Sequence, residues 1–310
     1  MIDRVAFQTV LQENEYGVMP AKPISVTAEK TGVDEKFCAG KAVLSDYLLT
    51  AETEKGTVRF PFRLCVRKGK PRQRAVICLN FRPDVPDKYL PAEEILDRGW
   101  AFALLCYRDV TDDSPLIDEN AAILAGTGET APGKLAMWAW AASRVLDALS
   151  EMEEIDGDKI GVAGHSRLGK TALLAAAMDQ RFAFAHSNDS GSGGAALYAM
   201  QNERSESIAH LVKRFPYWFC PKFADYIDRE RELPFDQDML LSLIAPRLLS
   251  VGSAAEDLWA NPEAERASAE RAAAAWGQNG GVSYYCRSGS HYFSREDWNR
   301  LFDFLEEKIK

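Results

Sequence analysis

The sequence predicts a three-layer α/β fold, in which a mostly parallel central sheet is covered by helices on both faces. Apolar runs of strand length alternate with segments of helical spacing over most of the chain. The run 100–107 is apolar throughout, which suits a strand buried on both faces. A second strand-like run, 160–163, leads through Gly164 directly into a helix of small residues. These observations favour a sheet built from strand-helix-strand units.

The first half of the chain contains the beginning of this alternation. Residues 1–57 are polar, and we expect an irregular N-terminal extension there. Strands are expected at 58–66, 75–81 and 100–107. The basic turn 67–72 is interpreted as a solvated hairpin loop between the first two strands. A helix at 91–98 then separates the second strand from the third.

The second half continues the alternation more clearly. Helices are expected from about 130 to 149, up to 178 and from Ser294 to about 308. Strands are expected at 160–163, 184–187, 247–252 and 282–286. The segment 201–238, with its aromatic cluster 215–220, interrupts the rhythm and is interpreted as an insertion that lines the site, although aromatic packing would also explain it. We expect residues 1–310 to form a single domain.

Composition excludes several classes of function. A net charge of −9 and a pI near 5.2 disfavour nucleic acid as a partner. No apolar run approaches the roughly eighteen residues that span a membrane, and the first residues lack the order of a secretory signal, so we expect a cytoplasmic protein without a membrane partner. The six cysteines are scattered singly, which argues against a disulfide framework or a structural zinc site. Composition leaves the oligomeric state open.

Ser166 lies at the point where the strand of 160–163 turns into the next helix. Gly164 and Gly169 remove the Cβ atoms that would obstruct a sharp turn there. The pattern is typical of a nucleophile elbow, a strained strand-to-helix turn that exposes a reactive side chain. Leu168 occupies the second glycine position of the common G-x-S-x-G form. The alternative is an ordinary strand-turn-helix with an incidental serine.

A nucleophilic serine needs a neutral imidazole within hydrogen-bond reach and a carboxylate behind that imidazole. Among the four histidines, His165 adjoins the serine and is expected to point elsewhere. His186 lies in a strand-like run and His210 in the insertion. His291, in a Gly-Ser-His loop after the last strand, remains as the candidate base. The alternative is that it is an ordinary surface histidine.

Two aspartates could orient this imidazole. In α/β-hydrolases the order along the chain is serine, acid, histidine, with the acid after a late strand. Asp257 follows the strand of 247–252, and Asp189 follows the preceding strand. Neighbouring parallel strands end about 5 Å apart at the same edge of a sheet, so either carboxylate could reach the same histidine. Each could instead be a helix cap.

Four further residues are candidates for binding the substrate. Arg167 follows the serine, so its backbone N–H is the expected oxyanion donor and its guanidinium could add positive charge there. Lys170, one turn later, could meet a sugar hydroxyl or carboxylate. Trp259 and Trp218 offer flat faces on which sugar rings stack. The alternatives are a surface ion pair, a solvated lysine and core packing.

Four segments resemble one known family. Residues 164–173, G-H-S-R-L-G-K-T-A-L, are similar to the G-C-S-R-x-G-K-G-A-L elbow of the glucuronoyl esterases, the fifteenth family of carbohydrate esterases. Residues 188–194 resemble the E-S-G-x-G-G segment of that family. Residues 256–262 resemble the E-D-L-W-x-D-P segment of its bacterial members, and 287–291 its histidine loop. The resemblance extends from about residue 130 to the end.

The resemblance implies a role for each matching residue. Ser166 would be the nucleophile, His291 the base and Arg167 part of the oxyanion hole, while Lys170 and Trp259 would contact the uronic acid. The family places its acid at either of two positions, which correspond to Asp189 and Asp257. Asp189 is one methylene shorter than the glutamate of many members, so we expect Asp257 to be the main acid. His165 replaces a cysteine that forms a disulfide in secreted fungal members.

These observations together predict a serine carboxylesterase of α/β-hydrolase fold that acts on a small carbohydrate ester, preferably a uronate ester. No cofactor and no metal is expected. An acetyl-sugar esterase with the same catalytic residues is the nearest alternative, and a serine peptidase is a minor one. A non-catalytic binding protein that keeps the fold is an alternative from another class.

Overall fold

One mixed sheet holds the strands of residues 2–309, the part of the chain that the computed structural model describes. The strand order is β1-β2-β3-β5-β4-β6-β7-β8-β9. From β5 to β9 in this order neighbours run parallel, whereas β1, β2 and β3 are antiparallel to their neighbours. The strands are β1 (Ser25–Asp34), β2 (Ala42–Thr53), β3 (Gly56–Arg67), β4 (Gln73–Asn80), β5 (Trp100–Cys106), β6 (Ile155–His165), β7 (Phe184–Asn188), β8 (Leu248–Ala254) and β9 (Val282–Arg287). The predicted, mostly parallel sheet is confirmed.

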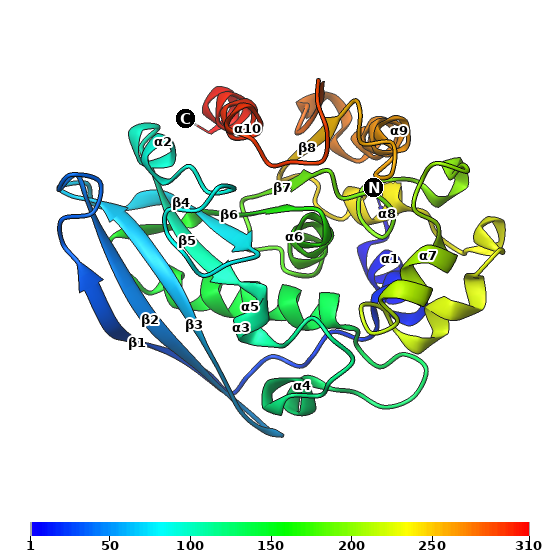
Figure 1. Cartoon of the computed structure of the whole chain (residues 1–310), viewed down its shortest axis with the longest axis horizontal. Helices are drawn as coiled ribbons and strands as arrows, with labels where there is room; N and C mark the ends of the chain where they lie inside the picture. Colours follow the sequence, from blue (N-terminus) through cyan, green and yellow to red (C-terminus); the bar gives the residue numbers. More distant parts are fainter. Residues whose placement is uncertain (1, 310) are drawn as a thin grey trace.

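The alternation of side chains along the central strands divides the core between the two faces of the sheet. In β4, Ile77 belongs to the larger core, whereas its neighbours Val76 and Cys78 belong to the smaller one. The larger core includes residues of α5 and α6, and the smaller one residues of α2 and α10. Figure 1 shows α2 and α10 on one side of the sheet and α5 on the other. The three predicted layers are therefore present.

The helices follow the predicted order, with the four main ones close to their expected bounds. They are α1 (Arg4–Leu11), α2 (Ala92–Asp97), α3 (Tyr107–Val110), α4 (Glu119–Leu124), α5 (Lys134–Ser150), α6 (Arg167–Met178), α7 (Ile208–Arg214), α8 (Gln237–Ser242), α9 (Pro262–Ala272) and α10 (Arg295–Lys308). Short 3₁₀ or π turns occur at Gln12–Tyr16, Tyr198–Met200, Pro221–Tyr226, Glu230–Glu232 and Ala273–Asn279. Within residues 2–309, no helix combines the length and the apolar character needed to cross a membrane.

The N-terminal stretch differs from the sequence prediction. Residues 1–57 were expected to be irregular, but their described part contains α1, a π turn and the antiparallel strands β1 and β2. For β1 the reason is its place at one edge of the sheet. Most of its side chains are exposed, so it lacks the apolar alternation that reveals a half-buried strand.

The predicted hairpin between the strands of 58–66 and 75–81 is also wrong. β3 and β4 are not neighbours, because β5 lies between them, antiparallel to β3 and parallel to β4. Sequence adjacency favours pairing, but β5 is buried along its whole length and needs a partner on each side. The basic turn therefore connects β3 to β4, which lie on opposite sides of β5.

The parallel strands end together at one edge of the sheet. His165 at the end of β6 pairs with Asn188 at the end of β7, and Asn188 pairs in turn with Gly252 of β8. Ser166 and Asp189 are the next residues after two of these ends. Ligand sites of open α/β sheets lie at this edge.

Candidate active site

The turn from β6 to α6 holds Ser166 in an unusual backbone conformation. Its φ of 59° and ψ of −127° lie outside the regions that non-glycine residues commonly adopt. Its N–H donates to the Asn188 carbonyl at 2.8 Å, which ties the turn to β7. A Cβ on Gly164 would lie 2.1 Å from the Leu168 carbonyl oxygen, and one on Gly169 3.0 Å from Ser187 Oγ. Gly164 is therefore needed for the turn, as predicted, whereas Gly169 allows close packing against residues 187–190.

Ser166 opens into a cavity of about 380 Å³, within the roughly 300–1,000 Å³ of small-molecule sites. All eight residues that the sequence singled out line it. They are Ser166, Arg167, Lys170, Asp189, Trp218, Asp257, Trp259 and His291. Glu206, Arg214, Phe215 and Trp218 come from the segment 201–238. A larger cavity of about 600 Å³ beside Tyr292 contains none of the eight.

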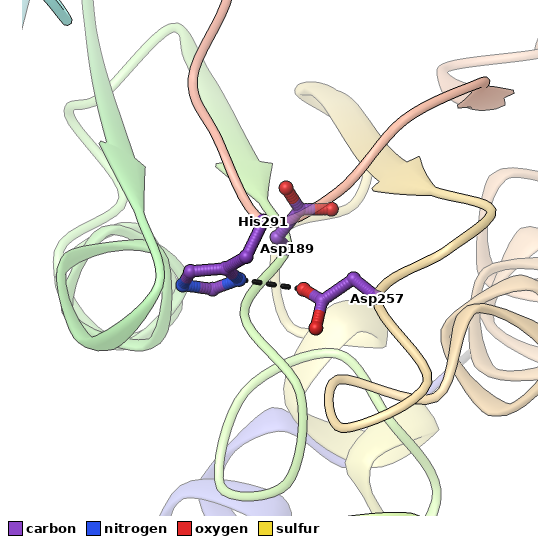
Figure 2. A group of neighbouring side chains, drawn as sticks. All are labelled: Asp189, Asp257 and His291. Carbon is purple, nitrogen blue, oxygen red and sulfur yellow. Dashed lines mark hydrogen bonds and ion pairs between the residues drawn. The ribbon is translucent and has the colours of Figure 1, made fainter.

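His291 is hydrogen-bonded to Asp257. Its Nδ1 donates to Oδ2 of Asp257 over 2.5 Å, and the carboxylate is buried while the imidazole is half-exposed. Figure 2 shows the ring held by this contact on one side, with its other nitrogen directed away from Asp257. This arrangement fixes the tautomer that leaves Nε2 able to accept a proton.

Asp189 is buried beside this pair but has different partners. One of its oxygens lies 3.4 Å from Arg287 Nη2 and 3.4 Å from the Tyr292 N–H. Its other oxygen has no partner in residues 2–309. Burial and the nearby carboxylates of Glu265 and Asp257 raise the pKa of Asp189 to about 8, an effect that outweighs Arg287. Asp189 is therefore mainly protonated at neutral pH.

His165 was expected to point away from the candidate base, but its ring packs beside it. Its ring lies 4.4 Å from that of His291, centroid to centroid, and its Nδ1 donates to Asn188 Oδ1 at 2.7 Å. Burial, with the neighbouring His291, lowers the pKa of His165 to about 3. A neutral ring therefore supports the face of the candidate base. The prediction was wrong because the ring turns back toward the loop after β9.

Asp113 holds the guanidinium of Arg167. The two form an ion pair in which Asp113 is almost fully buried. Trp218 donates from Nε1 to Asp113 at 2.8 Å, and Arg167 lies over the Trp218 ring at 4.6 Å. Trp218 is 2% exposed and stacks on Phe215 at 3.7 Å. It therefore positions Arg167 and offers no open face to a sugar.

Glu206 joins Lys170 to Trp259. It lies 3.1 Å from Lys170 Nζ and accepts a hydrogen bond from Trp259 Nε1 at 3.3 Å. Lys170 is buried and donates to the backbone carbonyls of Ser190 and Ser192, so it is not a solvated lysine. Trp259 is 44% exposed, which leaves an indole face for a ligand at the cavity rim.

Asp189, Asp257 and His291 could each offer one ligand atom to a metal ion, since these atoms lie within 4.8 Å of one another. Two observations disfavour such a site. The imidazole Nδ1 and a carboxylate oxygen of Asp257 are already hydrogen-bonded to each other. Arg287 contacts the third ligand, and its positive charge would repel a cation. The donor set fits an acid–base pair better than a metal centre.

Sequence reasoning missed the residues that support the candidate side chains. Asp113, Glu206, Arg287 and His165 contact the predicted residues directly. Arg287 lies in the same short segment as His291, so its proximity to the site could have been inferred. Asp113 and Glu206 lie in loops without a recognisable pattern, and only the folded chain brings them into contact with the predicted residues.

Comparison with known proteins gives a consistent result. A family model described as glucuronyl esterase, fungi, matches residues 124–280, just over half of the chain. The carbohydrate esterase MZ0003 of an unknown prokaryotic organism is 38% identical over 195 residues, which are 57% of this chain and 45% of that protein. The 4-O-methyl-glucuronoyl methylesterase of Podospora anserina is 35% identical over 255 residues, 78% of this chain and 48% of that protein. The chain spans about half the length of these relatives.

A solved structure resembles the whole described fold. The glucuronoyl esterase from Solibacter usitatus superposes with a TM-score of 0.87 at 27% identity, over 99% of this chain and 92% of that chain. This likeness confirms the predicted α/β-hydrolase fold.

Proposed function

Because the chain belongs to the glucuronoyl esterase family, we propose that it is a serine carboxylesterase that hydrolyses a uronic acid ester through an acyl-enzyme. The preferred substrate is an ester of glucuronic acid, as the name of the Podospora anserina relative indicates for that protein. The observation that carries the proposal is the 2.5 Å hydrogen bond from His291 to Asp257, in the cavity that Ser166 also lines. Such a pair is what a serine hydroxyl needs to become a nucleophile.

In the first half of the reaction, Ser166 Oγ attacks the ester carbonyl carbon while His291 Nε2 takes its proton. Asp257 stabilises the imidazolium that forms. The tetrahedral oxyanion then collapses, the bond to the alcohol oxygen breaks, and His291 returns the proton to the leaving alcohol. The uronoyl group remains bonded to Ser166 as an ester.

In the second half, His291 takes a proton from a water molecule as that water attacks the acyl carbon. A second oxyanion collapses, His291 returns the proton to Ser166 Oγ, and the uronic acid leaves. The imidazole is regenerated as a neutral base. Ser166 gives its proton to the leaving alcohol in the first half and regains one from water in the second, so the complete cycle leaves the enzyme's protons unchanged.

Arg167 stabilises the oxyanion in both halves. Its backbone N–H follows the nucleophile, and its guanidinium adds fixed positive charge. The ion pair with Asp113 and the contact with Trp218 hold this charge in place before substrate binds. Preorganised charge of this kind costs no rearrangement during the reaction.

Lys170, Glu206 and Trp259 form the sugar subsite. The glutamate links the ammonium to the indole, so the three groups present both charged and apolar surface along one cavity wall. A uronic acid ring can donate a hydroxyl to Glu206 and place an apolar face on Trp259, while Lys170, whose three N–H groups already have acceptors, holds the glutamate. This combination distinguishes a sugar ester from a simple alkyl ester.

Rates of hydrolysis on three esters test the proposal. The methyl ester of glucuronic acid should be turned over faster than an acetylated sugar or p-nitrophenyl acetate, and Ser166→Ala should be inactive on all three. After an acid quench, the mass of the Ser166 peptide should increase by a uronoyl group. An added acetyl group, with faster turnover of the acetylated sugar, would instead indicate an acetyl-sugar esterase.

Two other outcomes would replace the proposal. If a fluorophosphonate probe fails to label Ser166 in the folded protein, the chain is a non-catalytic binding protein. Faster cleavage of a peptide amide than of the matching ester would indicate a peptidase.

A further inference from the structure

Glu265 is a fully buried acid behind the candidate site. It lies on α9 and is 0% exposed. Its Oε1 accepts hydrogen bonds from the Gly191 N–H at 2.9 Å and from Ser190 Oγ at 3.2 Å. Its Oε2 accepts one from Ser253 Oγ at 2.5 Å. All three donors are uncharged.

These donors belong to the two segments that carry the candidate acids. Ser190 and Gly191 directly follow Asp189 in the loop after β7. Ser253 lies in β8, four residues before Asp257. One carboxylate therefore connects both segments. Asp257, which contacts His291, follows Ser253 by four residues in the same segment.

A buried carboxylate without a cationic partner is costly, so its presence needs an explanation. Burial, with a smaller contribution from the nearby Asp257, raises the pKa of Glu265 to about 7, although the hydrogen bonds from Ser253 and Gly191 oppose this shift. Its place in the first turn of α9 gives additional compensation from the helix dipole. An apolar residue would pack there without this penalty, but it could not accept the three hydrogen bonds.

We propose that Glu265 is a positioning residue for the reaction: by tying the loop after β7 to β8, it sets the place at which Asp257 meets His291. The inference rests on the proposed function and adds a residue that contacts neither the substrate nor the imidazole. It predicts that Glu265 acts through Asp257. Replacing a merely structural residue would lower stability, and its effect on kcat would be the same whether or not Asp257 is present.

A double-mutant cycle tests the dependence. Glu265→Ala should lower kcat on the methyl ester of glucuronic acid by about tenfold or more, with KM changed less than about twofold. In the Asp257→Asn background the same substitution should change kcat by less than about twofold, because the contact it positions is already lost. An equal loss in both backgrounds, or no loss in either, overturns the proposal.

Glu265→Gln provides the conservative variant. An amide can accept from Gly191 through oxygen and donate to Ser253 Oγ through nitrogen, so it should recover most of the lost kcat. If Glu265→Ala does not fold, the cycle is run with Glu265→Gln, which should lose a few-fold in kcat only where Asp257 is present. If Glu265→Gln loses no kcat in the protein that retains Asp257, the proposal is overturned. Ser268→Ala, a buried change on the same helix, is the matched control and should leave kcat unchanged.

The rate at which a fluorophosphonate labels Ser166 separates this inference from the proposed function. If the fluorophosphonate labels Ser166 but the protein hydrolyses none of the three esters, the proposed function fails. The labelling rate then takes the place of kcat in the double-mutant cycle. If the esters are hydrolysed and Glu265→Ala matches the wild type, only the inference fails. Absence of labelling in the wild type overturns both.

Discussion

At the scale of single residues, Asp257 and Asp189 approach one imidazole from neighbouring strand ends but lie in different surroundings. Asp257 accepts the hydrogen bond from His291, whereas Asp189 faces Arg287 and the Tyr292 N–H. Burial raises the pKa of Asp189 to about 8, so at neutral pH it is a poor acceptor for the imidazole N–H. The surroundings therefore favour Asp257 over Asp189 as the carboxylate that orients the candidate base.

Asp257→Asn should lower kcat more than Asp189→Asn. We expect a loss of about a thousandfold for Asp257→Asn, because the amide favours the wrong imidazole tautomer, and about tenfold or less for Asp189→Asn. Steady-state kinetics on the methyl ester of glucuronic acid gives both values. Glu256→Gln, at the exposed neighbouring position, is the control and should match the wild type. The reverse order of losses would make Asp189 the main acid.

Asp113 offers a second test at this scale. Asp113→Asn removes the negative charge that holds Arg167, so the guanidinium should leave the position in which it stabilises the oxyanion. We expect kcat to fall by about tenfold to a hundredfold, with a smaller change in KM. Asp112→Asn changes the exposed preceding aspartate and should have no effect. A rise in KM alone would mean that Arg167 binds the ground state only.

The sequence was sufficient to find the side chains of the candidate site but not the groups that support them. Ser166, Asp257 and His291 stand in motifs or follow strands, so their order along the chain could be interpreted. Asp113 and Glu206 reach the site through tertiary packing, which has no local sequence pattern. For the same reason His165, next to the nucleophile, was assigned the wrong direction.

At the scale of elements, the β6–α6 turn depends on close backbone packing. Gly164→Ala would place a Cβ 2.1 Å from the Leu168 carbonyl oxygen, so the turn would have to open. We expect the variant to lose at least about 2 kcal/mol of stability and most of its activity. Thermal unfolding and kcat measure the two effects. Gly157→Ala in the same strand, whose Cβ would have its nearest contact at 3.5 Å, should be close to neutral; equal losses in both variants would contradict this account.

Strands with buried side chains were predicted more accurately than exposed ones. Strands of the parallel part, such as β5 and β7, are buried throughout and were found close to their true bounds. The exposed edge strand β1 was missed, because its polar residues give no alternation. Strand order was harder still: nothing local to β3 or β4 indicates that β5 lies between them. Pairing is set by the packing of the whole sheet.

At the scale of the whole molecule, a buried acid that does not line the cavity links stability to pH. Glu15 accepts hydrogen bonds from Tyr198 and Gln237, both at 2.6 Å, and its other oxygen has no partner in residues 2–309. Burial raises the pKa of Glu15 from 4.5 to about 8. Because the folded value exceeds the unfolded one, the stability contributed by its protonated form is complete below pH 4.5 and is lost as pH rises toward 8.

Glu15→Gln should therefore make the free energy of unfolding less dependent on pH. The variant and the wild type should differ little at about pH 5, whereas at about pH 9 the variant should be more stable by on the order of a few kcal/mol. Urea unfolding at the two pH values measures the difference. Glu13→Gln, at an exposed position of the same π turn, should follow the wild type. A variant that loses stability at both pH values would show that the carboxylate is needed in its charged form.

The order of strands has one more consequence. The antiparallel ribbon of β1, β2 and β3 joins the parallel strands only where residues 63–65 of β3 meet residues 102–104 of β5, although β2 and β3 pair along their whole length. Because so few residue pairs join β3 to β5, we expect this pairing to open first. Amide hydrogens of β1 and β2 should therefore exchange with deuterium sooner than those of β4 and β6. Uniform protection across all strands would contradict this. Heating or mild denaturant would then separate the ribbon from the sheet first, while the strands that lead to Ser166 and His291 stay paired with their neighbours.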